Sequence, residues 1–131
     1  MANTVRTKQL DRTKILLVED DATARDALAA LLRIEGAEVT VTASGREALD
    51  LALSQSFDLL LTDLDLPDVP GDAVIRSVVA TAHVPVIVIT GSSERAVRRA
   101  RDAGADVVLT KPIDWPSLIG HVRSACPAAA A

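Results

Sequence analysis

Polar side chains able to bind a metal ion and an oxyanion follow four short apolar runs of this 131-residue chain. They are Glu19, Asp20 and Asp21 after the first run, Asp63 after the second, Thr90 after the third and Lys111 after the fourth. Three carboxylates about 4–5 Å apart would repel each other by several kcal/mol per pair at an effective dielectric near 20, so such a cluster requires a cation. Magnesium prefers oxygen ligands and often leaves coordination sites for phosphate. A lysine ammonium could neutralise more charge, and a threonine hydroxyl could bond an incoming oxyanion.

These groups can meet only if the apolar runs are strands of one sheet. The four runs are Ile15–Val18, Leu59–Leu61, Val86–Ile89 and Val107–Leu109. They are too short for helices and rich in branched residues, and their continuous hydrophobicity predicts strands covered on both faces of a parallel sheet. A fifth segment, residues 38–42, alternates in the manner of an edge strand.

Helices are predicted between the strands, from apolar residues at spacings of three and four. They cover residues 21–35, 44–53, 71–80, 93–103 and a last helix that begins at Asp114 and includes Val122. Asp21 is expected to cap the first helix, and Ser44 with Glu47 matches a capping box for the second. Gly36 and Gly104 are predicted helix stops.

Five successive β-α units predict an α/β fold with right-handed crossovers and helices on both faces of the sheet. Five strands favour a flavodoxin-like, doubly wound (βα)5 single domain with strand order 2-1-3-4-5, in which ligands bind beyond the carboxyl ends of the strands. We expect residues 1–12 to be a disordered extension, residues 13–125 to be the domain, and residues 126–131, with Cys126, to be a flexible tail.

Composition excludes several classes of protein. The net charge of −4 gives no electrostatic reason for direct nucleic-acid binding or for contact with an anionic membrane. A single cysteine cannot form an internal disulfide. The first 14 residues contain no apolar signal region, and no stretch approaches the roughly 18 apolar residues of a membrane span. We therefore expect a soluble, cytoplasmic protein without membrane insertion.

Four motifs in this order resemble the receiver domains of two-component response regulators. They are LLVEDD (16–21), DLLLTDLDLP (58–67), PVIVITG (85–91) and TKP (110–112), and the resemblance covers roughly residues 14–123. It implies a phosphorelay module that is not an enzyme, apart from catalysing its own phosphorylation and dephosphorylation. The implied partners are a sensor histidine kinase or a histidine phosphotransfer protein, and a downstream protein that the sequence does not identify.

The resemblance also assigns roles to individual residues. Asp63 would be the phosphoacceptor, and Glu19, Asp20, Asp63 and the backbone carbonyl of Asp65 would hold Mg²⁺ or Mn²⁺. Thr90 and Lys111 would bond the phosphoryl oxygens, and the Lys111–Pro112 peptide bond would be cis.

Departures from the family pattern leave alternatives open. Val108 stands where the family commonly has an aromatic switch residue, so an interaction module that never accepts phosphate is one alternative. The Asp63-Leu64-Asp65 motif resembles that of haloacid-dehalogenase phosphatases, which is a second alternative. The arginine-rich segment 95–101 is either a solvated helix face or a docking site for an acidic partner.

Overall fold

The computed structural model describes residues 8–91 and 93–126 and shows five β-α units in one domain. The strands are β1 (Lys14–Val18), β2 (Glu38–Thr42), β3 (Leu59–Thr62), β4 (Val86–Thr90) and β5 (Val107–Thr110). The helices are α1 (Ala22–Ile34), α2 (Gly45–Ser54), α3 (Gly71–Ala82), α4 (Glu94–Ala103) and α5 (Trp115–Ala125). In the described part of the chain, no helix is long and apolar enough to cross a membrane.

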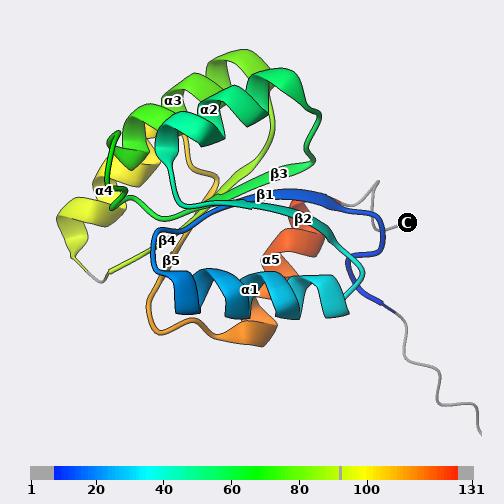
Figure 1. Ribbon diagram of the computed structural model, residues 1–131. Coiled ribbons are helices and arrows are strands. Elements are labelled where there is room, and N and C mark those ends of the chain that lie inside the picture. The colour runs from blue at the N-terminus through cyan, green and yellow to red at the C-terminus, as the bar shows by residue number, and fades with distance from the viewer. Residues whose placement is uncertain (1–7, 92, 127–131) are drawn as a thin grey trace, which may run out of the picture.

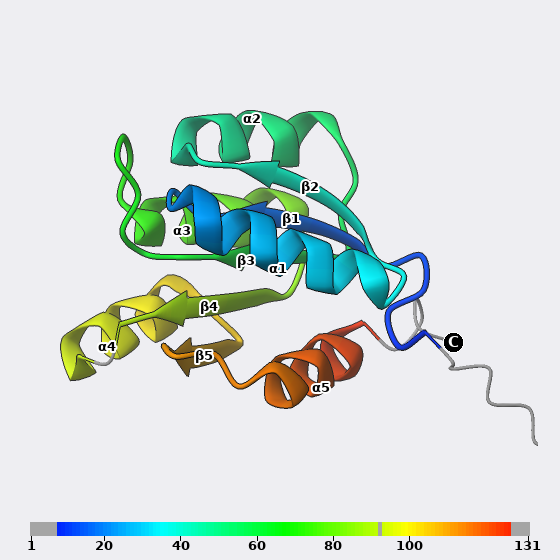
Figure 2. The ribbon, with the colours of Figure 1, turned by 60° about the horizontal axis from the view of Figure 1, so that its bottom comes forward.

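All neighbouring strands are parallel, and their order is β2-β1-β3-β4-β5, which confirms the predicted flavodoxin-like topology. Figure 2 shows this order from top to bottom. Val18 pairs with Thr62, and Thr90 pairs with Thr110. Because the strands run the same way in this register, the residues after their carboxyl ends meet at one edge of the sheet.

The sheet separates two apolar clusters, with α1 and α5 on one face and α2, α3 and α4 on the other (Figure 1). Alternate residues of β1 show how one strand serves both clusters: Ile15 and Leu17 belong to the first, while Leu16 and Val18 belong to the second. All four side chains are almost completely buried. This two-sided burial explains the continuous apolar runs of the central strands.

Four helices begin at capping residues whose side chains accept a hydrogen bond from a backbone amide three residues further on. These caps are Asp21, Ser44, Ser93 and Asp114. The predicted helix starts at Asp21, Ser44 and Asp114 are thereby confirmed. Gly104 ends α4 with a positive φ of 117°, and Gly36 follows the end of α1 with a φ of 99°.

Two segments differ from the sequence-based expectation at the ends of the domain. We expected a disordered extension through residue 12, whereas Leu10 is fully buried in the first cluster and its amide donates to the Glu35 carbonyl at 2.8 Å. We expected Cys126 in a flexible tail, whereas this residue directly follows α5 as its C-cap and is only 6% exposed. The remaining residues of both expected tails, 1–7 and 127–131, lie outside the described residues.

Candidate functional site

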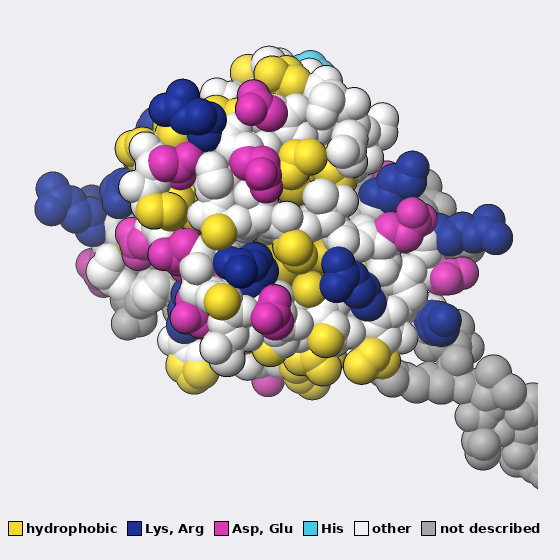
Figure 3. Space-filling model, viewed as in Figure 1, with side chains coloured by type: hydrophobic (Ala, Val, Ile, Leu, Met, Phe, Trp, Pro, Cys, Tyr) yellow, Lys and Arg dark blue, Asp and Glu magenta, His cyan; other side chains and the backbone are white. Residues whose placement is uncertain are grey.

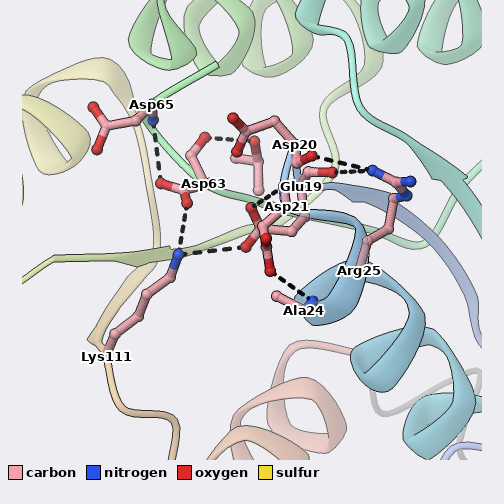
Figure 4. A network of polar contacts seen from close by, with 9 residues as sticks. Glu19, Asp20, Asp21, Ala24, Arg25, Asp63, Asp65 and Lys111 are labelled. Atoms are coloured by element: carbon pink, nitrogen blue, oxygen red, sulfur yellow. Dashed lines mark hydrogen bonds and ion pairs between the residues drawn. The ribbon is translucent and has the colours of Figure 1, made fainter. Parts of the chain in front are cut away.

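Most of the polar residues singled out in the sequence converge beyond the carboxyl ends of the strands; Figure 4 shows Glu19, Asp20, Asp63 and Lys111. Glu19 and Asp20 follow β1, Asp63 follows β3, and Lys111 follows β5, while Thr90 is the last residue of β4. The central strands β1 and β3 are adjacent, which brings together carboxylates that are far apart in the chain.

Glu19, Asp20 and Asp63 form a compact group of carboxylates. Each offers one oxygen, and these oxygens all lie within 4.8 Å of one another. Glu19 and Asp63 are buried, with exposures of 3% and 6%, whereas Asp20 is exposed. Two buried carboxylates and an exposed one therefore present a cluster of anionic oxygens at the edge of the sheet.

The main chain after Asp63 turns back toward its carboxylate. The Asp65 amide donates to Asp63 Oδ1 at 3.1 Å, while the exposed Asp65 side chain points away from Asp63 (Figure 4). The backbone of Asp65, rather than its carboxylate, is thus the part of that residue that lies against the phosphoacceptor candidate.

Lys111 supplies the positive charge of the site. Its Nζ lies 2.8 Å from Asp63 Oδ2 and 3.4 Å from Glu19 Oε1. Burial alone would lower the pKa of Lys111, but the hydrogen bond and charge of Asp63, with those of Glu19, raise it above its ordinary value. Burial also raises the pKa of Glu19, against the opposing effects of the Asp21 amide and of Lys111. The Lys111–Pro112 peptide bond is cis, as the resemblance implied.

Thr90 is buried at the same edge and brings a hydroxyl without a bonding partner. Its Oγ1 is fully enclosed and makes no hydrogen bond within the described residues. An open cleft of about 430 Å³ adjoins it, lined by Thr90, Gly91, Asp65 and two arginines of α4, Arg95 and Arg99. A buried unpaired hydroxyl is costly, and an oxyanion bound beside it would satisfy it.

These residues fit a hard divalent cation together with a phosphoryl group. The three clustered groups are carboxylates, which are ligands that Mg²⁺ and Mn²⁺ prefer. The orphan hydroxyl of Thr90 and the ammonium of Lys111 suit the oxygens of a phosphoryl group.

Two residues that support the site were missed in the sequence. Arg25 of α1 donates to the main-chain carbonyls of Glu19 at 3.0 Å and Asp20 at 3.4 Å (Figure 4). Asp68, in the loop after β3, binds the start of α2. Both make long-range or backbone contacts, so neither residue is marked by a local motif.

The arginine-rich segment 95–101 lies in α4, and among the described residues it makes one ion pair, with α3. Arg99 donates to Asp72 at the start of α3 at 2.8 Å, and Asp72 also pairs with Arg76 at 3.3 Å. Arg95, Arg98 and Arg101 are exposed. Figure 3 shows basic side chains protruding at the left, where Figure 1 places α4.

Residues 15–123 match the family described as the response regulator receiver domain. Sensory transduction protein RegX3 of Mycobacterium tuberculosis is 39% identical over 113 residues, which are 86% of this chain and 50% of RegX3. Cell cycle transcriptional regulator CtrA of Caulobacter vibrioides is 34% identical over 113 residues, which are 85% of this chain and 49% of CtrA. The chain spans about half the length of these curated relatives.

Solved structures share the fold across nearly their whole length. The receiver domain of sensor histidine kinase PA1611 from Pseudomonas aeruginosa, which holds a magnesium ion in its active site cleft, is 30% identical, with a TM-score of 0.83. The alignment covers 88% of this chain and 98% of that domain. A receiver domain protein from Methanospirillum hungatei is 27% identical, with a TM-score of 0.83 and coverages of 91% and 97%. In sequence and fold, this chain belongs to the family of response regulator receiver domains.

Proposed function

We propose that this chain accepts a phosphoryl group on Asp63 from a sensor histidine kinase or a histidine phosphotransfer protein. The observation that carries the proposal is the setting of Asp63: a buried carboxylate 2.8 Å from Lys111 and clustered with two more carboxylates. The unpaired Thr90 hydroxyl is on β4, the strand next to β3. Phosphoryl transfer depends mainly on positioning and on neutralising charge, and this set of residues supplies both.

In the proposed reaction, an Asp63 carboxylate oxygen attacks the phosphorus of a phosphohistidine. A P–O bond forms, the P–N bond breaks, and its electron pair returns to the imidazole. Lys111 offsets charge on the phosphoryl oxygens, and the Thr90 hydroxyl donates to one of them. Glu19, Asp20 and Asp63, with the main-chain carbonyl of Asp65, would hold Mg²⁺ or Mn²⁺, which supplies positive charge when bound.

Phosphorylation would also change the surface of the protein. The phosphoryl group adds charge and acceptor oxygens that attract Thr90 and Lys111. Thr90 ends β4, which a short loop joins to α4, so its movement would reach the face formed by α4, β5 and α5. Val108 packs in the cluster on the α4 side of the sheet and has no aromatic ring to swing, so we assign the response to Thr90 and its loop.

The remaining parts of the proposal concern the setting of the chain. Receiver domains are not an enzyme family, and we propose no activity beyond phosphorylation and dephosphorylation of the chain itself. We also propose a cytoplasmic location and a protein, rather than a nucleic acid, as the direct downstream contact of this domain.

Incubation with acetyl phosphate, with and without Mg²⁺, tests the proposal. The expected product is a protein carrying one phosphoryl group, detected by intact mass and dependent on Mg²⁺. Asp63→Asn should remove the modification, whereas Asp50→Asn, which changes an exposed carboxylate of α2, should keep it.

This experiment and two further assays, of beryllofluoride binding and of phosphate ester hydrolysis, separate the alternatives. If the wild type takes no phosphoryl group and binds no beryllofluoride, the chain is an interaction module that does not accept phosphate. Sustained hydrolysis of a chromogenic phosphate ester would indicate a phosphatase. Modification that persists in Asp63→Asn would overturn the choice of phosphoacceptor.

A further inference from the structure

The loop of residues 63–70, between β3 and α3, is held at both ends by backbone hydrogen bonds. At its start, the Asp63 amide donates to the Val18 carbonyl of β1 at 3.1 Å. At its end, the Gly71 amide donates to the Leu64 carbonyl at 3.0 Å, and a Cβ on Gly71 would lie only 2.5 Å from the Leu64 backbone. Between these anchors, the main chain from 65 to 70 needs contacts of its own to take one conformation.

Asp68 provides the polar contacts of the middle of this loop. Its carboxylate accepts hydrogen bonds from the Ser44 hydroxyl at 2.7 Å, from the amides of Gly45 and Arg46 at 2.9 and 3.1 Å, and from the Val69 amide at 3.0 Å. Amides at a helix start lack partners within the helix and favour an anion. The loop is therefore tied to the start of α2, a helix that contributes no residue to the acidic cluster.

Apolar packing holds the same two segments together. A Cβ on Gly45 would lie 3.2 Å from Leu66 and 3.3 Å from Val69, both in the loop, and 3.1 Å from Val74 of α3. Glycine at the first position of α2 lets the helix approach the loop closely. Figure 2 shows the loop at the left, between β3 and α3, beside the start of α2.

Asp68 is an anion at neutral pH. The hydrogen bond from Ser44, followed by that from the Arg46 amide, lowers its pKa from 3.8 to about 2. Its hydrogen bonds are thus charge-assisted, and such bonds are stronger than neutral ones.

We propose that Asp68 is a positioning residue, which fixes the loop to α2 and so holds the main chain of Asp65 in place beside Asp63 and a bound divalent cation. Only Leu66 and Pro67 separate Asp65 from Asp68, and the proline ring restricts φ, so a shift of Asp68 is passed on over a short and partly rigid segment. The Asp65 amide, in turn, donates to Asp63 Oδ1. The inference rests on the proposed function, because it concerns the same cation and the same phosphoacceptor.

The test compares the wild type with Asp68→Ala, Asp68→Asn and Asp50→Asn. Asp50 is exposed on α2, the helix that Asp68 contacts. Asp50→Asn therefore makes the same change of charge as Asp68→Asn without touching the loop. Three properties are measured: the Mg²⁺ dissociation constant by calorimetry, the hydrogen exchange of the Asp65 amide without metal, and Tm.

In Asp68→Ala we expect Mg²⁺ affinity to fall by about tenfold, as is usual when residues that orient metal ligands are removed. The Asp65 amide should exchange faster than in the wild type. Asp68→Asn keeps one acceptor oxygen and should lie between Asp68→Ala and the wild type. Asp50→Asn should match the wild type in all three properties.

A purely structural role for Asp68 predicts a different pattern. Asp68→Ala would then have a lower Tm but, well below that temperature, the Mg²⁺ affinity and Asp65 exchange of the wild type, and this result would overturn the inference. Failure of the proposed function can be distinguished from failure of the positioning role. A wild type that takes no phosphoryl group, while its Mg²⁺ affinity still depends on Asp68, would refute phosphorylation and support the positioning role.

Discussion

Replacing Asp63 with Asn should stabilise the protein when no divalent cation is present. Asp63 is 6% exposed, so its charge is largely removed from water. It also lies among carboxylates that repel it. An asparagine has nearly the same shape and no charge, so the substitution isolates the electrostatic part of the site.

The geometry gives the size of the effect. Oxygens of Glu19 and Asp20 lie within 4.8 Å of an Asp63 oxygen, where repulsion at an effective dielectric near 20 is about 3.5 kcal/mol per pair. The 2.8 Å separation of Asp63 and Lys111 gives an attraction of about 6 kcal/mol on the same basis. Before solvent screening, the two repulsions therefore exceed the one attraction by about 1 kcal/mol. Solvent weakens the attraction to Lys111, whose side chain is 40% exposed, and also the repulsion from the exposed Asp20.

Thermal unfolding followed by circular dichroism in EDTA measures this difference. For a domain of this size, about 1 kcal/mol corresponds to a rise in Tm of about 3–5 °C. Added Mg²⁺ should raise the Tm of the wild type by linkage and that of Asp63→Asn much less, because the variant lacks one carboxylate of the proposed cation site. The stability advantage of the variant should therefore shrink as Mg²⁺ is added.

The control is Asp50→Asn, which removes an exposed carboxylate outside the cluster and should leave Tm nearly unchanged. If Asp63→Asn unfolds at a clearly lower temperature than the wild type in EDTA, the ion pair with Lys111 outweighs the repulsion. The charge argument for a cation site would then be refuted.

Three further predictions concern Thr90, Asp68 and Cys126. Thr90→Val replaces a buried hydroxyl that lacks a partner among the described residues, so the free energy of unfolding in urea should rise by about 1 kcal/mol; a loss of stability would mean that the hydroxyl is satisfied. The folded-state pKa of Asp68, about 2, lies below its ordinary 3.8, so its stabilising contribution should be complete above about pH 4 and lost as pH falls through 2. The free energy of unfolding should therefore fall less in Asp68→Asn than in the wild type as the pH is lowered. Identical dependence on pH in the two proteins would contradict this. Burial raises the pKa of Cys126 to about 11, so a disulfide reagent should react slowly at pH 8 until denaturant is added; fast reaction of the folded protein would contradict the burial.

Much of the fold could be predicted from local patterns. Runs such as Val86–Thr90 are buried along their whole length because they lie inside the sheet, and their continuous apolar residues reflect this burial on both faces. The five helix starts were predicted to within about one residue, and four of them follow capping residues that bind an amide only three positions away. The strand β5 was expected to be covered on both faces, but its residues are half-exposed or exposed, since β5 lies at the edge of the sheet.

The ends of the domain could not be predicted in the same way. Leu10 is a lone apolar residue in a polar segment, and only its contact with the cluster around α1 and α5 shows that it belongs to the core. Cys126 follows Leu118 and Val122 at intervals of four, a spacing that places all three on one side of α5. The alanine-rich sequence after Cys126 masked this helical period.

The site residues were predictable as a set because each one follows a predicted strand. Their pairing was not, because the distances of Lys111 from Asp63 and from Glu19 depend on how the strands twist and on where the side chains turn. Asp68 left no signal in the sequence, because it caps a helix that starts more than 20 residues before it. A cap supplied by a distant loop can be found only in three dimensions.

The ion pairs of Lys111 span 48 residues to Asp63 and 92 residues to Glu19. During synthesis the acidic residues therefore leave the ribosome well before the lysine that neutralises them. A nascent chain that ends before β5 contains Glu19 and Asp63 but not Lys111, so it cannot yet form the complete cluster of charges. Under the proposed function, a product truncated before β5 would lack Lys111 and should therefore accept a phosphoryl group poorly.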